Sequence, residues 1–323
     1  YTGGTTGVSK GATLTHRNMV ANTLQATAWL KSFLPGDAPP ATVIAALPLY
    51  HIFALTSCAF MWLREGGNNL LITNPRDMPG FIKELKSQPF HVIFGVNTLY
   101  NGLMNTPGFE TVDFSNLRSA IAGGMALQGA VAQRWKEKTG CVLSQGWGLT
   151  ETSPVATMSL PDADFNGAIG LPVSSTEISI RDDLGRELGV GDVGEICVRG
   201  PQVMRGYWNR PDETAKVMLE GGWLKTGDIG RIDEQGFVYI QDRKKDMILV
   251  SGFNVYPNEV EDVIAKHPGV LEVAAVAQPD EKSGEIVVVF VVRKDAGLTE
   301  QALIEFSRTE LTGYKVPKRV YFR

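Results

Sequence analysis

The chain has 323 residues, of which 43% are apolar, so it is long enough for two or more domains with sizeable cores. Its formal net charge of −4 gives no sign of a nucleic-acid partner, and no apolar run approaches the ~18 residues of a membrane-spanning helix. The three cysteines and four histidines lack the spacing of a metal site, and such scattered cysteines are typical of buried thiols in a reducing compartment.

The first half of the chain alternates between helical and extended patterns. Helices are predicted over residues 15–29, 81–85 and 130–138, and strands over residues 43–47, 91–95 and 120–122. This alternation over residues 1–165 predicts an α/β fold built on a layered sheet.

The pattern changes after residue 165. Short alternating runs at 176–181, 195–199 and 237–241 are separated by glycine turns and predict a β-rich subdomain. A charged joint follows at residues 242–246. Beyond it we predict a small α+β module, with a helix beginning at Pro257, strands over 270–277 and 286–292, and a last helix capped by Thr299.

A glycine- and threonine-rich segment opens the chain, Tyr1-Thr2-Gly3-Gly4-Thr5-Thr6-Gly7-Val8-Ser9-Lys10-Gly11. Its glycines leave backbone N–H groups accessible, its hydroxyls add donors and Lys10 adds positive charge, so the segment suits a polyphosphate. It is not a Walker A loop, because no lysine directly follows Gly7 in a G-x-x-x-x-G-K frame. A flexible linker is the competing interpretation, and the lysine and threonines in one tight frame before a helix argue against it.

Six further motifs follow in order. They are Pro48-Leu49-Tyr50-His51, Gly146-Trp147-Gly148-Leu149-Thr150-Glu151, Gly194-Glu195 through Gly206-Tyr207-Trp208, Trp223-Leu224-Lys225-Thr226-Gly227-Asp228, Asp242-Arg243-Lys244-Lys245-Asp246 and Gly313-Tyr314-Lys315-Val316-Pro317. Together with the opening segment they resemble the signatures of the adenylate-forming (AMP-binding) superfamily, which includes acyl- and aryl-CoA ligases, peptide-synthetase adenylation domains and beetle luciferases. Residues 50–55, 72–77 and 250–259 look most like the bacterial long-chain fatty acyl-CoA ligases.

The resemblance implies a domain organisation. A large N-terminal adenylation domain (1–241) combines the layered α/β sheet with the β-rich subdomain. A hinge (242–246) connects it to a small mobile α+β C-terminal domain (247–323). The family pattern is longer at both ends, since its N-terminal third and its final Gly-Lys motif are absent here. The chain also begins at Tyr1 rather than at methionine. We therefore expect an incomplete sequence that is inactive by itself.

The resemblance also implies a two-step reaction. ATP and a long-chain fatty acid give acyl-AMP and pyrophosphate, and the acyl group then passes to the thiol of coenzyme A with release of AMP. Mg²⁺ is the implied cofactor, ATP and coenzyme A are co-substrates, and the pathway is lipid metabolism. The implied location is the cytoplasm, with peripheral contact at the inner face of the cytoplasmic membrane and an oligomeric state both left open.

The nucleotide site is assigned by the same resemblance. The phosphates are assigned to Thr2, Gly3, Gly4, Thr5, Thr6, Gly7 and Lys10. The adenine side is assigned to Gly123, Gly124, Trp147 and Gly148. The ribose is assigned to Asp228 and Arg243, since a carboxylate accepts two hydroxyl donors. The sequence after Gly124 is Met125-Ala126 rather than the family's usual Ala-Pro, so the details of the adenine pocket stay open.

The remaining assignments concern catalysis and the acyl acceptor. Glu151 is the implied Mg²⁺ carboxylate, a hard oxygen ligand, and Thr150 the donor to the α-phosphate. His51 is either a gate beside the carboxylate pocket or a satisfied core histidine. The acyl chain is expected among residues 51–62 and 95–97. Lys245 is the implied hinge pivot, and Ser251 and Gly252 are the implied contacts of coenzyme A.

Three choices stay open. Lys315, Lys318 and Arg319 fit coenzyme A phosphates, an anionic membrane surface or an ordinary solvated face. The chain is either part of a complete ligase or a truncated product that binds nucleotide or partners without catalysis. The acyl acceptor is either coenzyme A or the thiol of a carrier protein.

Overall fold

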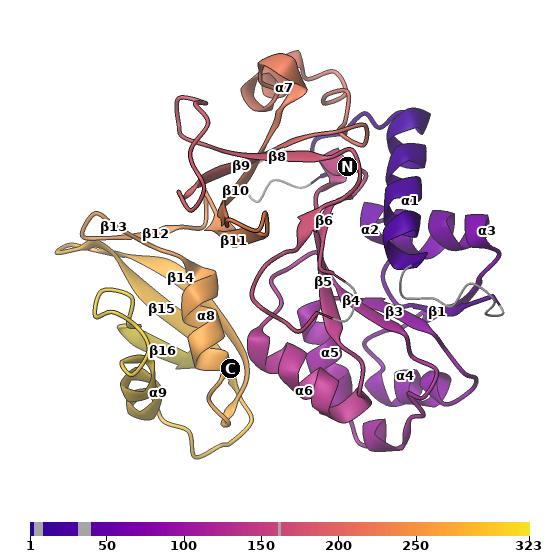
Figure 1. Cartoon of the computed structure of the whole chain (residues 1–323). Coiled ribbons are helices and arrows are strands. Elements are labelled where there is room, and N and C mark those ends of the chain that lie inside the picture. The colour runs from indigo at the N-terminus through magenta and orange to yellow at the C-terminus, as the bar shows by residue number, and fades with distance from the viewer. Residues whose placement is uncertain (3–8, 32–39, 161–162) are drawn as a thin grey trace. The chain divides into compact units, whose positions relative to one another are not determined.

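The computed structural model describes residues 1–2, 9–31, 40–160 and 163–323, and it divides into two compact units (Figure 1). The first unit comprises Tyr1–Leu127, Val131–Thr226 and Arg231–Tyr239. The second comprises Gln128–Ala130, Gly227–Gly230 and Ile240–Arg323. Each unit has a hydrophobic core of its own. The division into 1–241, 242–246 and 247–323 stays a prediction.

A seven-stranded sheet, in the order β2-β1-β3-β4-β5-β6-β7, forms the centre of the first unit. The pairs from β2 to β5 are parallel, and β6 and β7 continue the sheet in antiparallel pairs. The strands are β1 (Thr42–Ala45), β2 (Asn68–Leu71), β3 (Val92–Gly95), β4 (Ser119–Ala122), β5 (Leu143–Gly148), β6 (Val155–Met158) and β7 (Leu171–Pro172). The predicted α/β sheet is therefore confirmed.

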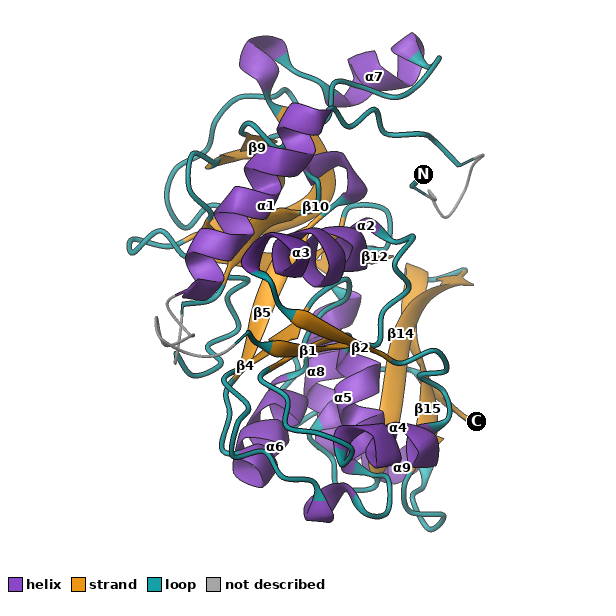
Figure 2. Ribbon diagram, turned by 90° about the vertical axis from the view of Figure 1, so that its right-hand side faces the viewer, coloured by secondary structure: helices purple, strands orange, loops and turns teal. Residues whose placement is uncertain are grey.

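Helices cover both faces of this sheet (Figure 2). Because side chains alternate along a strand, Ile44 of β1 packs with one set of helices while Val43 and Ala45 pack with the other. The first set is α4 (Met78–Leu85), α5 (Asn97–Met104) and α6 (Gly129–Thr139). The second set is α1 (His16–Leu30) and the continuous run of α2 (Ile52–Ala54), the π-helix η2 (Leu55–Phe60) and α3 (Met61–Glu65). Strands buried on both faces explain the apolar runs in the sequence.

A second sheet, in the order β11-β10-β9-β8, matches the predicted β-rich region. Its strands are β8 (Glu177–Arg181), β9 (Gly194–Arg199), β10 (Leu224–Ile232) and β11 (Val238–Arg243). Between β9 and β10 lie α7 (Pro211–Val217) and the 3-10 turn η5 (Glu220–Gly222). Two more 3-10 turns, η3 (Phe109–Thr111) and η4 (Thr150–Thr152), belong to the loops of the first sheet.

The second unit is an α+β fold, as predicted. Its sheet has the order β13-β12-β15-β14, with β16 paired in parallel to β15. Its elements are β12 (Ile248–Val250), β13 (Phe253–Val255), α8 (Pro257–Ala265), β14 (Val270–Asp280), β15 (Gly284–Arg293), α9 (Glu300–Ser307) and β16 (Arg319–Phe322). The start of α8 at Pro257 is confirmed. So is the cap at Thr299, whose side chain accepts the N–H of Ala302.

None of the helices in the described ranges is both long enough and apolar enough to cross a bilayer.

Candidate active site

The ends of the opening segment are paired with each other. The N–H of Thr2 donates to the carbonyl of Lys10 at 2.8 Å, and the N–H of Lys10 returns a bond to Thr2 at 3.0 Å. The predicted phosphate contacts Gly3, Gly4, Thr5, Thr6 and Gly7 lie outside the described residues. The chain leaves this segment into α1, where Thr15 and Asn18 form a capping box.

The segment after β5 is shaped by a glycine. A Cβ on Gly148 would lie 1.8 Å from the carbonyl oxygen of Pro154, so only glycine fits there. The chain turns back at this point, and the N–H of Leu149 donates to the same carbonyl at 3.2 Å. Thr150 and Glu151 follow in η4. The close approach of two backbone segments therefore accounts for Gly148 independently of any ligand.

Glu151 is a buried carboxylate with a specific donor. It is 7% exposed, and its Oε1 accepts the hydroxyl of Tyr207 at 2.7 Å. Its backbone carbonyl accepts the N–H of Met204 at 2.7 Å. Burial, reinforced by the charge of Glu151, raises the pKa of the Tyr207 phenol above its ordinary range, so the phenol stays a donor at neutral pH. The sequence showed Tyr207 within a motif but gave it no role.

Lys10 lies against the same tyrosine. Its Nζ is 4.9 Å from the centroid of the Tyr207 ring and 2.8 Å from Oε2 of Glu213. Hydrogen bonds from Lys10 and then Lys216 lower the pKa of the Glu213 carboxyl to about 2. Lys10 therefore contacts a carboxylate in this structure, whereas the sequence analysis assigned it to a phosphate.

The buried face of α1 holds the neighbourhood of Glu151 in place. The side-chain amide of Asn22 donates to the carbonyl of Val155 at 2.7 Å, and its oxygen accepts the N–H of Val155 at 2.9 Å. Asn18 donates to the carbonyls of Pro201 and Val203 at 2.7 and 2.9 Å. These amides connect α1 to Val155, which follows the Glu151 turn, and to the segment that contains Met204. No local pattern in the sequence indicates this role for the two asparagines.

The residues predicted for the adenine side lie at the ends of β4 and β5. Gly124 has a left-handed φ of +77°, and a Cβ on Gly123 would lie 3.0 Å from the carbonyl of Gly146. Trp147 is half-buried and packs against a small apolar cluster that includes Val198 and Met204. The indole therefore belongs partly to the core, which was the competing interpretation for a tryptophan between glycines.

The two predicted ribose contacts lie together in the second unit. Asp228 of β10 is 6% exposed, and its Oδ1 is 3.9 Å from Nε of Arg243 at the end of β11. The arginine side chain is 55% exposed. The structure therefore brings these two residues together as a loose ion pair with an accessible cation.

The predicted hinge is a turn at the end of β11. The N–H of Lys244 donates to the carbonyl of Gly227 at 2.9 Å, and that of Asp246 donates to Arg243 at 3.0 Å, so Lys245 lies within the turn. Just before it, the buried carboxylate of Asp242 accepts the N–H of Asn258 in the first turn of α8 at 2.9 Å. Burial raises the pKa of Asp242 despite this bond.

Ser251 and Gly252 form the two-residue turn between β12 and β13. Their φ values are +51° and +83°, and Val250 pairs with Phe253 across the turn. Two positive φ values in a two-residue hairpin are typical of a type I′ turn. Both residues are exposed, and a Cβ on Gly252 would meet no atom within 4 Å among the described residues. The predicted contacts of coenzyme A therefore form an accessible hairpin tip.

His51 is exposed and caps α2, where its Nδ1 accepts the N–H of Phe53 at 3.2 Å. The alternative of a buried core histidine is therefore wrong. The helical run that follows turns Ala54, Cys58 and Trp62 into the core below α1. Burial raises the pKa of the Cys58 thiol to about 12, which fits an inert core cysteine.

The basic residues near the end of the chain differ from one another. Lys315 forms an ion pair with Glu259 at 2.6 Å, and its side chain is 18% exposed. Lys318 and Arg319 are exposed. Lys315 therefore has a structural role, and the other two fit a solvated face or an anionic ligand.

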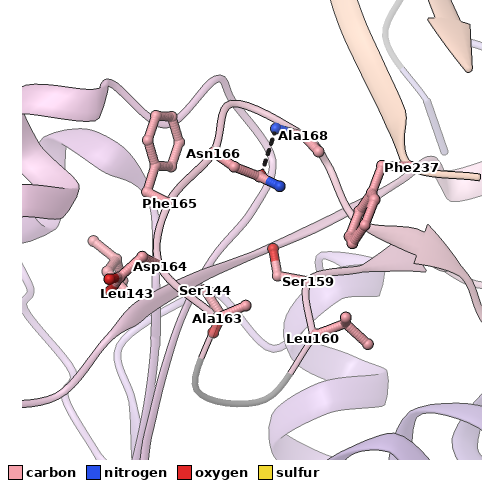
Figure 3. Close-up of a pocket in the computed structure, with 11 residues that line it drawn as sticks. Leu143, Ser144, Ser159, Leu160, Ala163, Asp164, Phe165, Asn166, Ala168 and Phe237 are labelled. Carbon is pink, nitrogen blue, oxygen red and sulfur yellow. Dashed lines mark hydrogen bonds between the residues drawn. The ribbon is translucent and has the colours of Figure 1, made fainter. Parts of the chain in front are cut away.

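A small pocket lies beside β5 and β6 (Figure 3). Leu143, Ser144, Ser159, Leu160 and Phe237 are among its lining residues. Its volume is about 10 Å³, which is room for about one water molecule, so it is not the site of a nucleotide or an acyl chain. Within the described ranges, no group of three or more histidine, cysteine or acidic side chains could hold a metal ion.

Comparison with known proteins supplies the identity of this arrangement. The model of the AMP-binding enzyme family matches residues 1–208, and that of the AMP-binding enzyme C-terminal domain matches residues 259–323. The chain belongs to the AMP-binding enzyme family. It is 57% identical to a long-chain-fatty-acid–CoA ligase of Escherichia coli O157:H7 over its full length, but it spans only 57% of that protein.

Two further relatives broaden the comparison. A feruloyl-CoA synthase of an Amycolatopsis species is 35% identical over the whole chain, which spans 65% of that protein. The structure of ATP-bound MatB from Rhodopseudomonas palustris superposes with a TM-score of 0.87 at 34% identity, covering 99% of this chain and 62% of that one. These matches bear out the adenylate-forming resemblance and its fold.

Proposed function

We propose that the full-length protein is a long-chain fatty acid–CoA ligase that forms an acyl-AMP and then an acyl-CoA. The observation that carries the proposal is the 57% identity to a long-chain-fatty-acid–CoA ligase along the entire chain. The proposal is supported by the buried Glu151 and by the Asp228–Arg243 pair, whose chemistry suits a nucleotide.

In the first step, a carboxylate oxygen of the fatty acid attacks the α-phosphorus of ATP and the bond to the β-phosphate breaks. The opening segment, residues 2–10, binds the departing phosphates through backbone N–H groups and hydroxyls. Thr150 donates its hydroxyl to the α-phosphate. Trp147 and the Gly123–Gly124 turn hold adenine, and Asp228 and Arg243 hold the ribose.

The donor set fits Mg²⁺, because this ion is usually held by one or two carboxylates together with substrate phosphates and water. Glu151 would hold it, since one carboxylate oxygen is fixed by Tyr207. Within the described residues, the other oxygen accepts no hydrogen bond. When bound, Mg²⁺ supplies charge neutralisation on the leaving pyrophosphate.

In the second step, the thiol sulfur of coenzyme A attacks the acyl carbonyl, the bond to AMP breaks and the thiol proton leaves. Rotation of the C-terminal domain about Lys245 switches the enzyme between the two steps, because this small domain cannot present the lysine of the family's final Gly-Lys motif and the Ser251–Gly252 turn to the active site at the same time. The exposed Ser251–Gly252 turn lets the pantetheine arm approach the backbone closely.

His51 gates the carboxylate end of the acyl site, and the acyl chain runs along residues 51–62 and 95–97. Each methylene that it buries contributes about 0.8 kcal/mol. We also propose peripheral contact with the inner face of the cytoplasmic membrane, for which the exposed Lys318 and Arg319 offer positive charge.

The test is a competition experiment. The full-length protein receives ATP, Mg²⁺ and coenzyme A with an equimolar mixture of saturated acids from C4 to C18 and ferulic acid, and the products are resolved by mass spectrometry. We expect acyl-CoA from the acids of 12 carbons or more, on the order of 10²-fold above the short acids, because each additional buried methylene adds affinity. Feruloyl-CoA as the main product would favour the aromatic-acid function suggested by the 35% identical synthase. Formation of acyl-AMP without acyl-CoA, with transfer of the acyl group once a carrier protein is added, would favour the carrier-protein thiol as the acceptor.

A further inference from the structure

The donor to Glu151 comes from a distant part of the chain. The hydroxyl of Tyr207 lies 2.7 Å from Oε1 of Glu151, and the two residues are separated by 56 positions in the sequence. We propose that Tyr207 is a positioning residue for the ATP-dependent step, whose hydroxyl fixes one oxygen of Glu151 so that the other is presented to the metal and the ATP phosphates. This inference rests on the proposed function, and it adds a residue to which the family resemblance assigned no role.

The backbone that carries Tyr207 is held firmly. The N–H of Tyr207 donates to the hydroxyl of Thr214 in α7 at 2.9 Å, and that hydroxyl in turn donates to the carbonyl of Arg210 at 2.9 Å. Gly206 has a φ of +147°, and a Cβ there would lie 2.8 Å from the methyl carbon of Thr214. Glycine at 206 is therefore what lets the chain pass close to α7. A side chain on such a backbone can orient a neighbouring ligand group.

The residues on either side of Tyr207 are hydrogen-bonded to the residues that follow the opening segment. Gly11 accepts the N–H of Trp208 at 2.7 Å, and Thr13 exchanges bonds with Gly206 and Arg205 at 2.8 and 3.0 Å. The backbone next to Tyr207 is thus paired with the residues directly after Lys10.

The Tyr207 ring itself has two charged neighbours. Its hydroxyl contacts the carboxylate of Glu151, while Nζ of Lys10 lies 4.9 Å from the ring centroid and is also bound to Glu213. A cation near the face of an aromatic ring is attracted to it. The tyrosine therefore connects the proposed phosphate lysine and the proposed metal carboxylate through one rigid side chain. Removing only the hydroxyl would abolish the contact with Glu151 and leave the contact between the ring and Lys10.

The test is Tyr207→Phe in the full-length protein. This variant keeps the ring near Lys10 and removes the donor to Glu151. ATP binding is measured by calorimetry without fatty acid, at a series of free Mg²⁺ concentrations and in excess chelator. We expect the Mg²⁺ concentration needed for half-maximal ATP affinity to rise about 10-fold or more, as is usual for partners of metal ligands. The affinity for ATP measured in excess chelator, without Mg²⁺, should be unchanged. In an assay of acyl-CoA formation at saturating Mg²⁺ and ATP, KM for the fatty acid should not change.

Tyr239→Phe is the matched control. Tyr239 of β11 is half-buried, burial and then the carboxylate of Asp233 raise the pKa of its phenol, and Arg231 lies 4.0 Å from its ring centroid. This variant removes a tyrosine hydroxyl near a different carboxylate, and it should bind Mg²⁺ and ATP like the wild type. A double variant, Tyr207→Phe with Glu151→Gln, should show no loss beyond that of Glu151→Gln alone, because the two groups act through one contact.

Two results would overturn the proposal. One is unchanged Mg²⁺ dependence in Tyr207→Phe. The other is an equal loss of ATP affinity with and without Mg²⁺, together with a lowered melting temperature, which would make Tyr207 a structural residue only. The proposed function fails separately, if the wild-type protein binds ATP with Mg²⁺ but activates no long-chain acid.

Discussion

The half-buried carboxyl of Glu261 in α8 should make the stability of the second unit depend on pH. Burial raises the pKa of its carboxyl from 4.5 to about 7, while the N–H of Ala275 donates to it at 2.8 Å and the charge of Asp242 adds to the effect of burial. Since the folded state holds the proton more tightly than the unfolded state, this group stabilises the fold fully below pH 4.5. That contribution is lost as the pH rises from 4.5 to about 7.

The magnitude follows from the pKa difference. At about 1.4 kcal/mol per pKa unit, a change from 4.5 to about 7 corresponds to about 3 kcal/mol. Solvent reaches part of this half-buried carboxyl and screens its charge, so we expect about 2 kcal/mol. Glu261→Gln keeps an oxygen acceptor for Ala275 but carries no charge. The variant should match the wild type near pH 4.5 and be more stable by about 2 kcal/mol at pH 8.

The assay must report on the second unit. All six tryptophans lie in the first unit, so fluorescence would miss the effect. Hydrogen exchange of peptides covering α8, β14 and β15 measures it directly, with Glu272→Gln, an exposed acid on β14, as the control. The reasoning would be refuted if Glu261→Gln and wild type were equally protected at pH 8, or if their difference were the same at pH 4.5.

Three other substitutions test separate parts of the account. Gly148→Ala should destabilise the first unit by at least about 3 kcal/mol, since its Cβ would lie 1.8 Å from the Pro154 carbonyl oxygen. Gly146→Ala should be tolerated, because the nearest atom to its Cβ lies at 3.8 Å. Identical unfolding curves for the two variants, measured by tryptophan fluorescence, would contradict this. Asp228→Ala should weaken ATP binding by about 1–3 kcal/mol in calorimetry without affecting fatty acid binding, and unchanged ATP affinity would remove it from the site. In the full-length protein, Lys245→Pro should spare acyl-AMP formation and severely slow acyl-CoA formation in single-turnover measurements, because proline fixes φ at the pivot; equal slowing of both steps would indicate a damaged fold instead.

Helix starts and buried strands could be predicted from the sequence, because their signals lie within a few neighbouring residues. Thr299 caps one helix and Pro257 begins another, as predicted, because caps and N-terminal prolines act within a single turn. The buried strands β1 and β3 were predicted from apolar runs that need no partner to be recognised. The edge strand β2 was missed, since Asn68 and Asn69 are poor strand formers and the strand exists through its pairing with β1.

The candidate site divides in the same way. Glu151 and Asp228 were proposed as site residues from motifs, because each lies within a contiguous signature. The partnership of Glu151 with Tyr207 was not, since a contact across 56 positions has no local pattern. The pairing of Lys10 with Glu213, 203 positions away, was missed for the same reason. The Ser251–Gly252 turn could have been predicted, because a Ser-Gly pair between two apolar runs is typical of a hairpin.

The most direct test of the central claim is exchange of labelled pyrophosphate into ATP by the full-length protein, driven by a long-chain fatty acid in the absence of coenzyme A. This exchange reports the first step alone and depends on the carboxylate assigned to the metal. We expect fatty-acid-dependent exchange by the wild type and a fall of about 10²-fold or more in Glu151→Gln, which keeps the side-chain shape and removes the charge. Absence of exchange in the wild type, or equal exchange in the variant, would contradict it.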